Sequence, residues 1–332
     1  MKPWVALVLA GCTLAGERSG TGSCPPGETC SDKTPNGLAL LGTKLGDDPL
    51  GPMQPLATAV GGTQQLTVVT GATSGAPTFA LPFDATTTSP DLAVTDVAPP
   101  KLTVEGLAAG TSDLRLVEPG TQLLYDRLPL AVAAVATVDL RPLVYSVATS
   151  DADFAANTGA GWAMLAGGTD DVLVRLGAGD GTRIVDQRMT IAATGSAFAS
   201  GQMLAWDTLR VRATGAGEGT LIVRTGDGAT HPQAVPLAAA VDDVLWVSAQ
   251  DAVAPNGTAI VDSAPIYCFR AVSGTHLVAG ATWSYTATFG LTLTTSVARN
   301  CVVVTAGAGS TGGTLTVTAS GVSRDFTVAF VG

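Results

Sequence analysis

The strongest constraint on the fold is a pattern that recurs three times along the chain. Three segments begin alike, with a short turn and then alternating apolar residues: 61–68, 167–174 and 256–261. Three segments end alike, with Gly-Thr and then a strand-like run: 110–116, 219–223 and 313–317. Both landmarks recur roughly 90–110 residues apart, about the length of one small β domain. The repetition predicts three tandem domains, over residues 56–140, 141–241 and 242–332.

Within each repeat the apolar residues have a period of two. Leu315 and Val317 alternate with threonines, and Phe326, Val328 and Phe330 share one face. Alternation with β-branched residues is typical of strands, and Gly-rich turns roughly every 8–12 residues are typical of a sandwich. We find no helical period of useful length, so the sequence predicts an all-β fold made of β-sandwiches.

The first dozen residues have the layout of an export signal. Lys2 supplies positive charge, residues 4–9 are apolar, and small residues precede Cys12. The tetrapeptide Leu9-Ala10-Gly11-Cys12 resembles the lipobox of bacterial lipoproteins, which places a lipid on Cys12 and a signal peptide at residues 1–11. This signal is short against the roughly 15–30 residues of ordinary ones, so a start upstream of Met1 stays open. The alternative interpretation is a buried apolar strand with an incidental cysteine.

The other four cysteines form a local pair, Cys24 with Cys30, and a distant pair, Cys268 with Cys301. Four cysteines remain once Cys12 is set aside, and an even number of cysteines in an exported chain is expected to form disulfides, here two. The four do not cluster as metal ligands do, and none lies in a Cys-x-x-Cys motif. A metal-binding or redox role is therefore not expected.

Residues 12–55 are rich in glycine, proline and polar residues and show no sustained period. Such a composition predicts a flexible tether that holds the folded part away from a surface. The apolar run at 38–41 is the part of this tether that can dock on the folded chain.

Two stretches of the third repeat permit a comparison with a known family. Ala281-Thr282-Trp283-Ser284 has the pattern of a strand with a core tryptophan, and Gly313-Thr314-Leu315-Thr316-Val317 that of a closing strand. With the final apolar strand they resemble bacterial immunoglobulin-like (Big-type) domains, the tandem modules of envelope and adhesin proteins. The resemblance covers residues 56–332 and implies β-sandwiches that space, display or bind, without implying an activity.

Charge and motifs weigh against several classes of function. The net charge is −10 with no run of Lys or Arg, so a nucleic-acid partner is not expected. His231 and His276 lie in turn sequences away from any Gly-x-Ser-x-Gly elbow. No catalytic residue is therefore expected, and the chain is not expected to be an enzyme. The acidic residues at 151–153 and 242–243 lie at the predicted domain junctions, where a shared calcium ion would stiffen the array. They lack the spacing of a calcium loop, so solvated loop acids are the favoured interpretation and no metal is expected. No cofactor is expected either.

Together these features predict a lipoprotein of the cell envelope, lipid-anchored at the outer membrane and either periplasmic or surface-exposed. Its expected function is display, adhesion or scaffolding, in which edge strands and loops contact a protein or polysaccharide partner. The alternative is a lipoprotein that captures polysaccharide, since four tryptophans are available to stack on sugars: Trp162, Trp206, Trp246 and Trp283. An exposed coplanar pair of aromatic rings would favour the alternative, and tryptophans packed in the cores would count against it.

Overall fold

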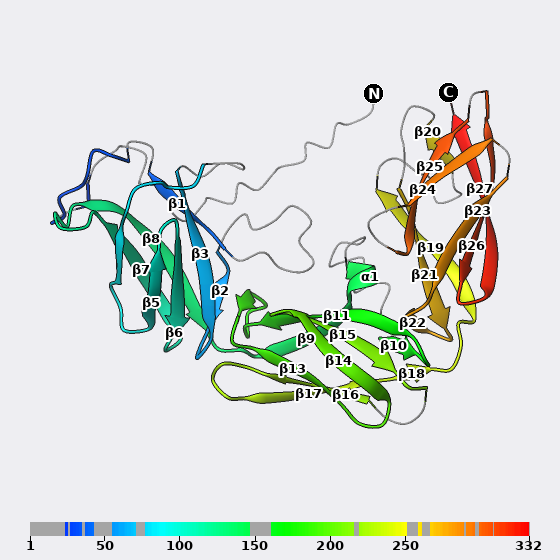
Figure 1. Cartoon of the computed structure of the whole chain (residues 1–332), viewed down its shortest axis with the longest axis horizontal. Coiled ribbons are helices and arrows are strands. Elements are labelled where there is room, and N and C mark those ends of the chain that lie inside the picture. The colour runs from blue at the N-terminus through cyan, green and yellow to red at the C-terminus, as the bar shows by residue number, and fades with distance from the viewer. Residues whose placement is uncertain are drawn as a thin grey trace, which may run out of the picture. The chain divides into compact units, whose positions relative to one another are not determined.

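A computed structural model of the 332-residue chain describes residues 24–25, 27–34, 37–42, 55–70, 77–146, 161–215, 219–250, 258–260, 266–288, 290–295, 299–307 and 309–331. Strands are by far the commonest element of the described chain, which has one four-residue helix, α1 (Leu143–Ser146) (Figure 1). The predicted all-β class is therefore confirmed. Contacts divide the chain into two compact units. Unit 1 contains the described parts of Met1–Lys44, Leu50–Ala136 and Ala178–Gln187, and unit 2 the remainder. The division into three domains stays a prediction.

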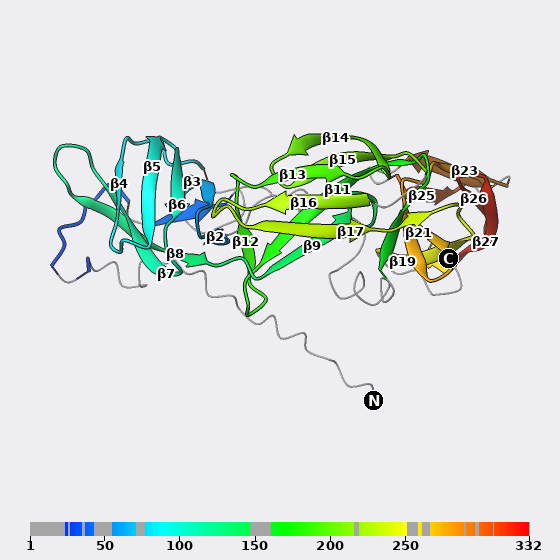
Figure 2. The ribbon, with the colours of Figure 1, turned by 90° about the horizontal axis from the view of Figure 1, so that it is seen from below.

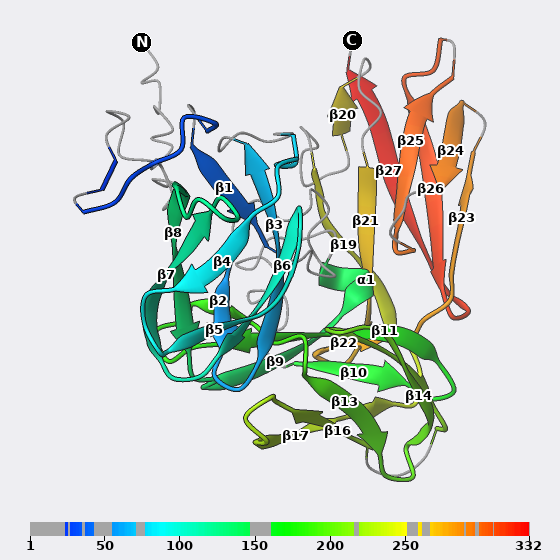
Figure 3. The same ribbon diagram turned by 60° about the vertical axis from the view of Figure 1, so that its left-hand side comes forward.

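Unit 1 contains two sheets. The first has the strand order β1 (Leu38–Leu41), β3 (Thr63–Thr70), β6 (Lys101–Gly106), β5 (Leu92–Ala98), with antiparallel pairing throughout. The second has the order β12 (Arg183–Val185), β2 (Ala57–Ala59), β8 (Leu124–Ala133), β7 (Gly110–Val117), β4 (Asp84–Thr87). Figure 3 shows strands of both sheets. β12 comes from the middle of the chain, and it belongs to unit 1 because Ile184 and Val185 are buried and pair with β2.

The core of unit 1 follows from the period of two. Leu66 and Val68 of β3 and Leu114 and Leu116 of β7 are fully buried, and they belong to one apolar cluster contributed by both sheets. Burial of each such side chain contributes roughly 1.5–3 kcal/mol, which is the main term holding the sheets together.

Part of the predicted tether belongs to unit 1. Leu38 and Leu40 of β1 are buried in the same apolar cluster. The side chain of Asp126 accepts a hydrogen bond from the backbone N–H of Leu38 at 2.7 Å. Arg115 forms a two-pronged ion pair with Glu28, at 3.1 and 2.7 Å. The described residues from 24 to 42 are thus fastened to the folded unit, because apolar burial and paired charges outweigh the local preference for turns.

Unit 2 contains two pairs of sheets, and Figure 2 shows strands of the first pair. One sheet of this pair has the order β9 (Thr137–Pro142), β11 (Thr169–Gly177), β15 (Thr208–Ala213), β14 (Phe198–Ala205). The other has the order β13 (Thr190–Thr194), β16 (Gly219–Arg224), β17 (Thr230–Val235). Alternate residues such as Leu209, Val211, Leu221 and Val223 are fully buried. The second and third predicted domains both lie in this unit.

The second pair of sheets holds the C-terminal sandwich. One sheet has the order β18 (Leu237–Ala238), β10 (Trp162–Leu165), β22 (His276–Ala279), β21 (Ile266–Ser273), β25 (Cys301–Ala306), β24 (Leu291–Thr295), and β19 (Asp243–Gln250) also pairs with β21. The other has the order β20 (Thr258–Ile260), β27 (Val322–Val331), β26 (Gly312–Ala319), β23 (Trp283–Ala287). Between the two sheets the ring centroids of Phe269 and Phe326 are 4.9 Å apart. Trp246 packs edge-on to Phe326, with 6.2 Å between their ring centroids.

β10 joins the two pairs of sheets of unit 2 into one body. It pairs in parallel with β22, although the sequence analysis places these strands in different domains. Beside this pairing the buried hydroxyl of Tyr145 donates to the Val278 carbonyl at 2.6 Å and accepts from the Ala271 N–H at 3.2 Å. The predicted second and third domains therefore share a sheet.

Candidate functional site

The predicted disulfide partners lie together in the structure. Cys24 bonds to Cys30 and Cys268 bonds to Cys301. Cys12, the predicted lipidation site, lies outside the described residues.

The Cys268–Cys301 bond links two neighbouring strands of one sheet. Cys268 on β21 stands directly opposite Cys301 on β25, and their Cα atoms are 4.1 Å apart. The Phe269 N–H donates to the Asn300 carbonyl at 2.9 Å, so the cysteines occupy a position without hydrogen bonds between them. Side chains approach each other most closely at such positions, which explains why a disulfide fits there. Both cysteines are buried, so the bond forms part of the packed sheet.

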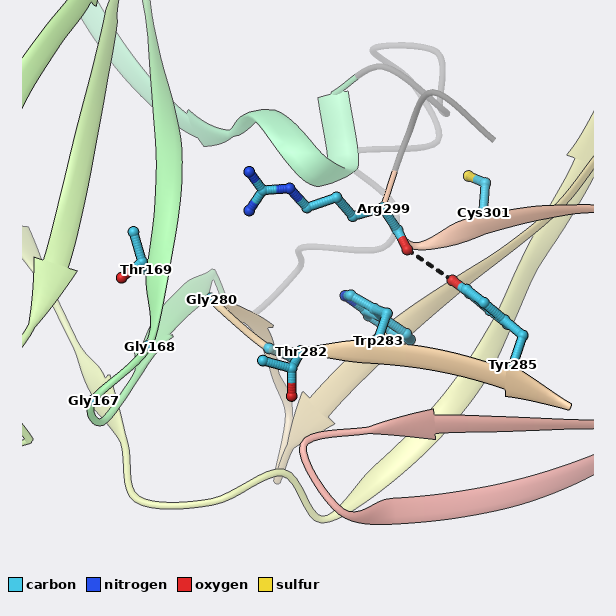
Figure 4. Close-up of a pocket in the computed structure, with 10 residues that line it drawn as sticks. Gly167, Gly168, Thr169, Gly280, Thr282, Trp283, Tyr285, Arg299 and Cys301 are labelled. Carbon is cyan, nitrogen blue, oxygen red and sulfur yellow. Dashed lines mark hydrogen bonds between the residues drawn. The ribbon is translucent and has the colours of Figure 1, made fainter. Parts of the chain in front are cut away.

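A groove of about 650 Å³ opens beside this disulfide, within unit 2 (Figure 4). Its lining combines a glycine-rich turn, the start of β23 and the segment before β25: Gly167, Gly168, Thr169, Gly280, Ala281, Thr282, Trp283, Tyr285, Arg299 and Cys301. Its volume lies in the range of roughly 300–1,000 Å³ that is usual for small-molecule sites.

Strand alternation places Trp283 and Tyr285 on the same side of β23. The residues between and after them, Ser284 and Thr286, are exposed on the opposite face. The ring of Tyr285 lies 6.1 Å from Phe269 of the core, and its hydroxyl donates to the Arg299 carbonyl at 2.9 Å. Burial raises the pKa of Tyr285, so the hydroxyl stays protonated and keeps this bond. The aromatic wall of the groove is therefore rigid.

The opposite wall is the turn between β10 and β11. A Cβ atom on Gly168 would lie 2.7 Å from the carbonyl oxygen of Gly280, so only glycine permits this close approach. Asp170 fixes the contact from behind, since its carboxylate accepts the N–H of Gly280 and of Asp171, each at 2.8 Å. Burial raises the pKa of Asp170 to about 6, and the two backbone hydrogen bonds act against this rise.

Arg299 supplies the charge of the groove. Figure 4 shows its side chain extending from the segment before β25 across the hollow towards β11. Among the described residues, its exposed guanidinium forms no hydrogen bond or ion pair. Its charge acts on Asp170, whose pKa it lowers slightly against the effect of burial. The groove thus offers two aromatic rings, the hydroxyls of Thr169 and Thr282 and one available cation. These groups are suited to binding a ligand.

The four tryptophans are half-buried. Trp162 donates to the Leu140 carbonyl at 2.9 Å, while Trp246 and Trp283 pack against the core of the C-terminal sandwich. Among the residues whose exposure is described, no aromatic side chain is exposed, so the exposed coplanar pair of rings that would favour polysaccharide capture is not found. The predicted core role of Trp283 is therefore incomplete, because its ring also lines the groove. The spacing Trp283-x-Tyr285 on one strand was the signal available in the sequence. Arg299 carried none, and the turn at 167–169 was marked only as the opening of a repeat.

The same side of the sandwich ends in two edge strands, β23 and β24. In the described structure β23 pairs only with β26, and β24 only with β25. Neither strand contains a charged residue, a proline or a bulge. Most other edges carry protection of the usual kind, such as Pro232 in β17, a bulge in β5 and two in β14.

Among the described strands, only β25 pairs with β24, so one side of its backbone has no strand partner. The Gly307 N–H donates to the Gly290 carbonyl at 2.8 Å, which fixes the phase of the ladder that β24 forms with β25. In this phase the N–H and carbonyl groups of Leu293 and Thr295 point away from β25, towards the open edge.

Of the predicted junction acids, those at 151–153 lie outside the described residues, whereas Asp242 and Asp243 have protein partners. Asp242 accepts hydrogen bonds from the Gly274 N–H at 2.7 Å and from Ser273, and Asp243 pairs with Arg324 at 2.6 Å. Over the ranges that the structure describes, we find no group of three potential metal ligands and no helix long and apolar enough to cross a membrane.

Comparisons with known proteins give structural neighbours only. We find no matching family model and no matching curated protein sequence. Domains 4–9 of the surface-layer protein SbsC align with 88% of this chain and 47% of that one, at 15% identity and a TM-score of 0.30. The Escherichia coli adhesin FdeC aligns with 84% of this chain and 95% of that one, at 13% identity and a TM-score of 0.24. This chain thus spans about half the length of the SbsC structure. At these TM-scores we base the function on this chain's own residues.

Proposed function

We propose that this protein is a non-enzymatic envelope lipoprotein that displays a binding surface and acts in adhesion or scaffolding. The observation that carries the proposal is the open edge formed by β23 and β24. An unprotected edge of a soluble protein is a hazard unless a partner uses it, because it offers unpaired backbone groups to any extended chain. A partner strand would pair with Leu293 and Thr295 of β24, and the main-chain hydrogen bonds would supply the affinity.

Lysine substitutions on the edge strand β24 test this proposal. We expect Thr292→Lys with Thr294→Lys to abolish adhesion by cells that display the full chain, because lysine on an edge strand opposes strand addition. The matched control is Ser323→Lys with Thr327→Lys, which adds the same charge at exposed positions of β27, away from β23 and β24. Equal adhesion by wild type and edge variant would contradict the proposal, provided that surface display is equal.

Attachment to the envelope is the second part of the proposal. Two disulfides support an oxidising compartment outside the cytoplasm. The described residues of 24–42 are packed on unit 1. This supports display, because a pulling force applied at the N-terminus would be transmitted to the folded unit. We expect the full chain to carry a lipid-sized mass increase and to fractionate with membranes, and Cys12→Ser to lose both. A soluble protein with unmodified Cys12 would contradict the anchor.

A second candidate function, polysaccharide capture, is favoured by the groove. Trp283 and Tyr285 supply apolar ring surface, and the hydroxyls of Thr169 and Thr282 supply hydrogen bonds. Sugars require both kinds of contact, because their rings have apolar faces and hydroxyl edges. Trp283→Leu, which keeps an apolar side chain in the core but removes the ring, is expected to abolish glycan binding. Unchanged binding of a glycan by this variant would exclude the groove as the site.

A further inference from the structure

We infer that the groove beside β23 binds a carboxylated sugar of an acidic polysaccharide, and that Arg299 selects it by pairing with the carboxylate. This inference rests on the second candidate function and names its ligand class. It begins from the charge of the groove, where Arg299 is the only ionisable side chain among the lining residues apart from Tyr285 and the disulfide-bonded Cys301.

Several arginines of this chain pair with an acid, and Arg299 differs from them. The sequence has 27 acidic residues against 17 Lys and Arg, so a cation can often pair with an acid. Arg115, Arg210 and Arg324 all do so. Arg299 does not form such a pair within the described residues, and it extends over a hollow. An exposed guanidinium that is left without a carboxylate is suited to take one from a ligand, because its planar donors match a carboxylate with two parallel hydrogen bonds.

Asp170, the acid whose pKa burial raises and Arg299 lowers, does not pair with the Arg299 guanidinium. Asp170 is buried behind the wall, and its two oxygens are occupied by the N–H groups of Asp171 and Gly280. Asp171 in turn is engaged by Arg210, at 2.7 and 2.9 Å. The guanidinium of Arg299 therefore remains free for a ligand on the open side of the groove.

The other walls point to a sugar ring as the body of the ligand. Trp283 and Tyr285 present aromatic surface held against the core, so stacking on them costs little conformational entropy. Opposite them, the glycine turn at 167–168 brings backbone close to the hollow without side chains. A small inorganic anion would use Arg299 alone and leave both rings without contact.

The test measures binding of defined glycans to the purified protein by calorimetry. The acidic probe is a galacturonic acid tetrasaccharide, and its neutral partner is the fully methyl-esterified tetrasaccharide, which keeps the rings but not the charge. Inorganic phosphate serves as the anion without a ring. We expect the acid to bind at least tenfold more tightly than the ester, and phosphate not to compete at millimolar concentration.

Variants assign the effect to the groove. Arg299→Gln is expected to weaken binding of the acid by about 10- to 100-fold, the scale of a charge-assisted pair, and to leave the ester unchanged. Arg224→Gln, at an exposed position of β16 outside the groove lining, is the matched control and should bind like wild type. Arg299 is exposed, so its variant should fold normally, which an unchanged melting temperature would verify.

The outcomes separate the inference from the function on which it rests. Equal binding of acid and ester, lost in Trp283→Leu, would overturn the carboxylate inference and leave polysaccharide capture standing. An absence of binding to the whole panel, extended to glucuronate and mannuronate oligomers and to neutral glucans, would overturn both. Competition by phosphate with equal affinity would replace the sugar by a simple anion and overturn the inference.

Discussion

Removal of the Cys268–Cys301 disulfide is expected to destabilise unit 2 as a whole. The two cysteines are 33 residues apart, and closure of a loop of this length lowers the entropy of the unfolded chain by an amount worth about 3–4 kcal/mol. The Cys24–Cys30 loop, with a separation of 6, gives only about 2 kcal/mol by the same relation. The double variant Cys268→Ala/Cys301→Ala should therefore lower the melting temperature of unit 2 by roughly 10 °C.

Guanidinium unfolding followed by tryptophan fluorescence measures this loss. Trp246 and Trp283 pack against the core of the affected sandwich and Trp162 lies beside the shared β10–β22 pairing, so one transition should report on all three. Unit 1 contains none of the four tryptophans discussed above, and its unfolding should be followed by circular dichroism as a separate, unshifted transition. A loss below about 1 kcal/mol would refute the loop-entropy reasoning. Separate transitions for the two sheet pairs of unit 2 would refute its cooperativity.

Three further predictions concern individual contacts. Burial raises the pKa of Asp170 to about 6 from its usual 3.8, so unit 2 should lose up to about 3 kcal/mol of stability as the pH rises from 4 to 7, and Asp170→Asn should flatten this slope in pH-dependent unfolding. Tyr145→Phe leaves the Val278 carbonyl and the Ala271 N–H without their partner and should cost about 1–3 kcal/mol in chemical denaturation. Arg115→Gln removes the two-pronged pair with Glu28 and should speed proteolytic cleavage before β1, whereas an unchanged cleavage rate would mean that strand pairing alone holds this segment.

The strands could be predicted from the sequence because their signal is local. Leu315 and Val317 are buried as their alternation indicates, and Phe326 packs on the core face. The pairing of β10 with β22 could not be predicted, because register between distant strands depends on the whole sheet rather than on either segment. Burial of β1 against unit 1 was signalled only by a short apolar run, which competed with the turn-rich composition around it.

The candidate site likewise combines a part that could be predicted from local sequence with a part that depends on the tertiary fold. Alternation on β23 places Trp283 and Tyr285 on one side, and this was readable from the sequence. The groove exists because the turn at 167–168 and the residue before Asn300 reach the same place by tertiary folding. Arg299 has no motif around it, so its role depends entirely on what the fold places beside it.

The adhesion of cells that display the full-length chain tests the central claim most directly. Wild type, the edge variant Thr292→Lys/Thr294→Lys and the β27 control Ser323→Lys/Thr327→Lys should be compared at equal surface density. The claim predicts strong adhesion by wild type and control and its loss in the edge variant, because the charges block strand addition at β24. Adhesion that survives in the edge variant, or that no variant supports above empty cells, would contradict it.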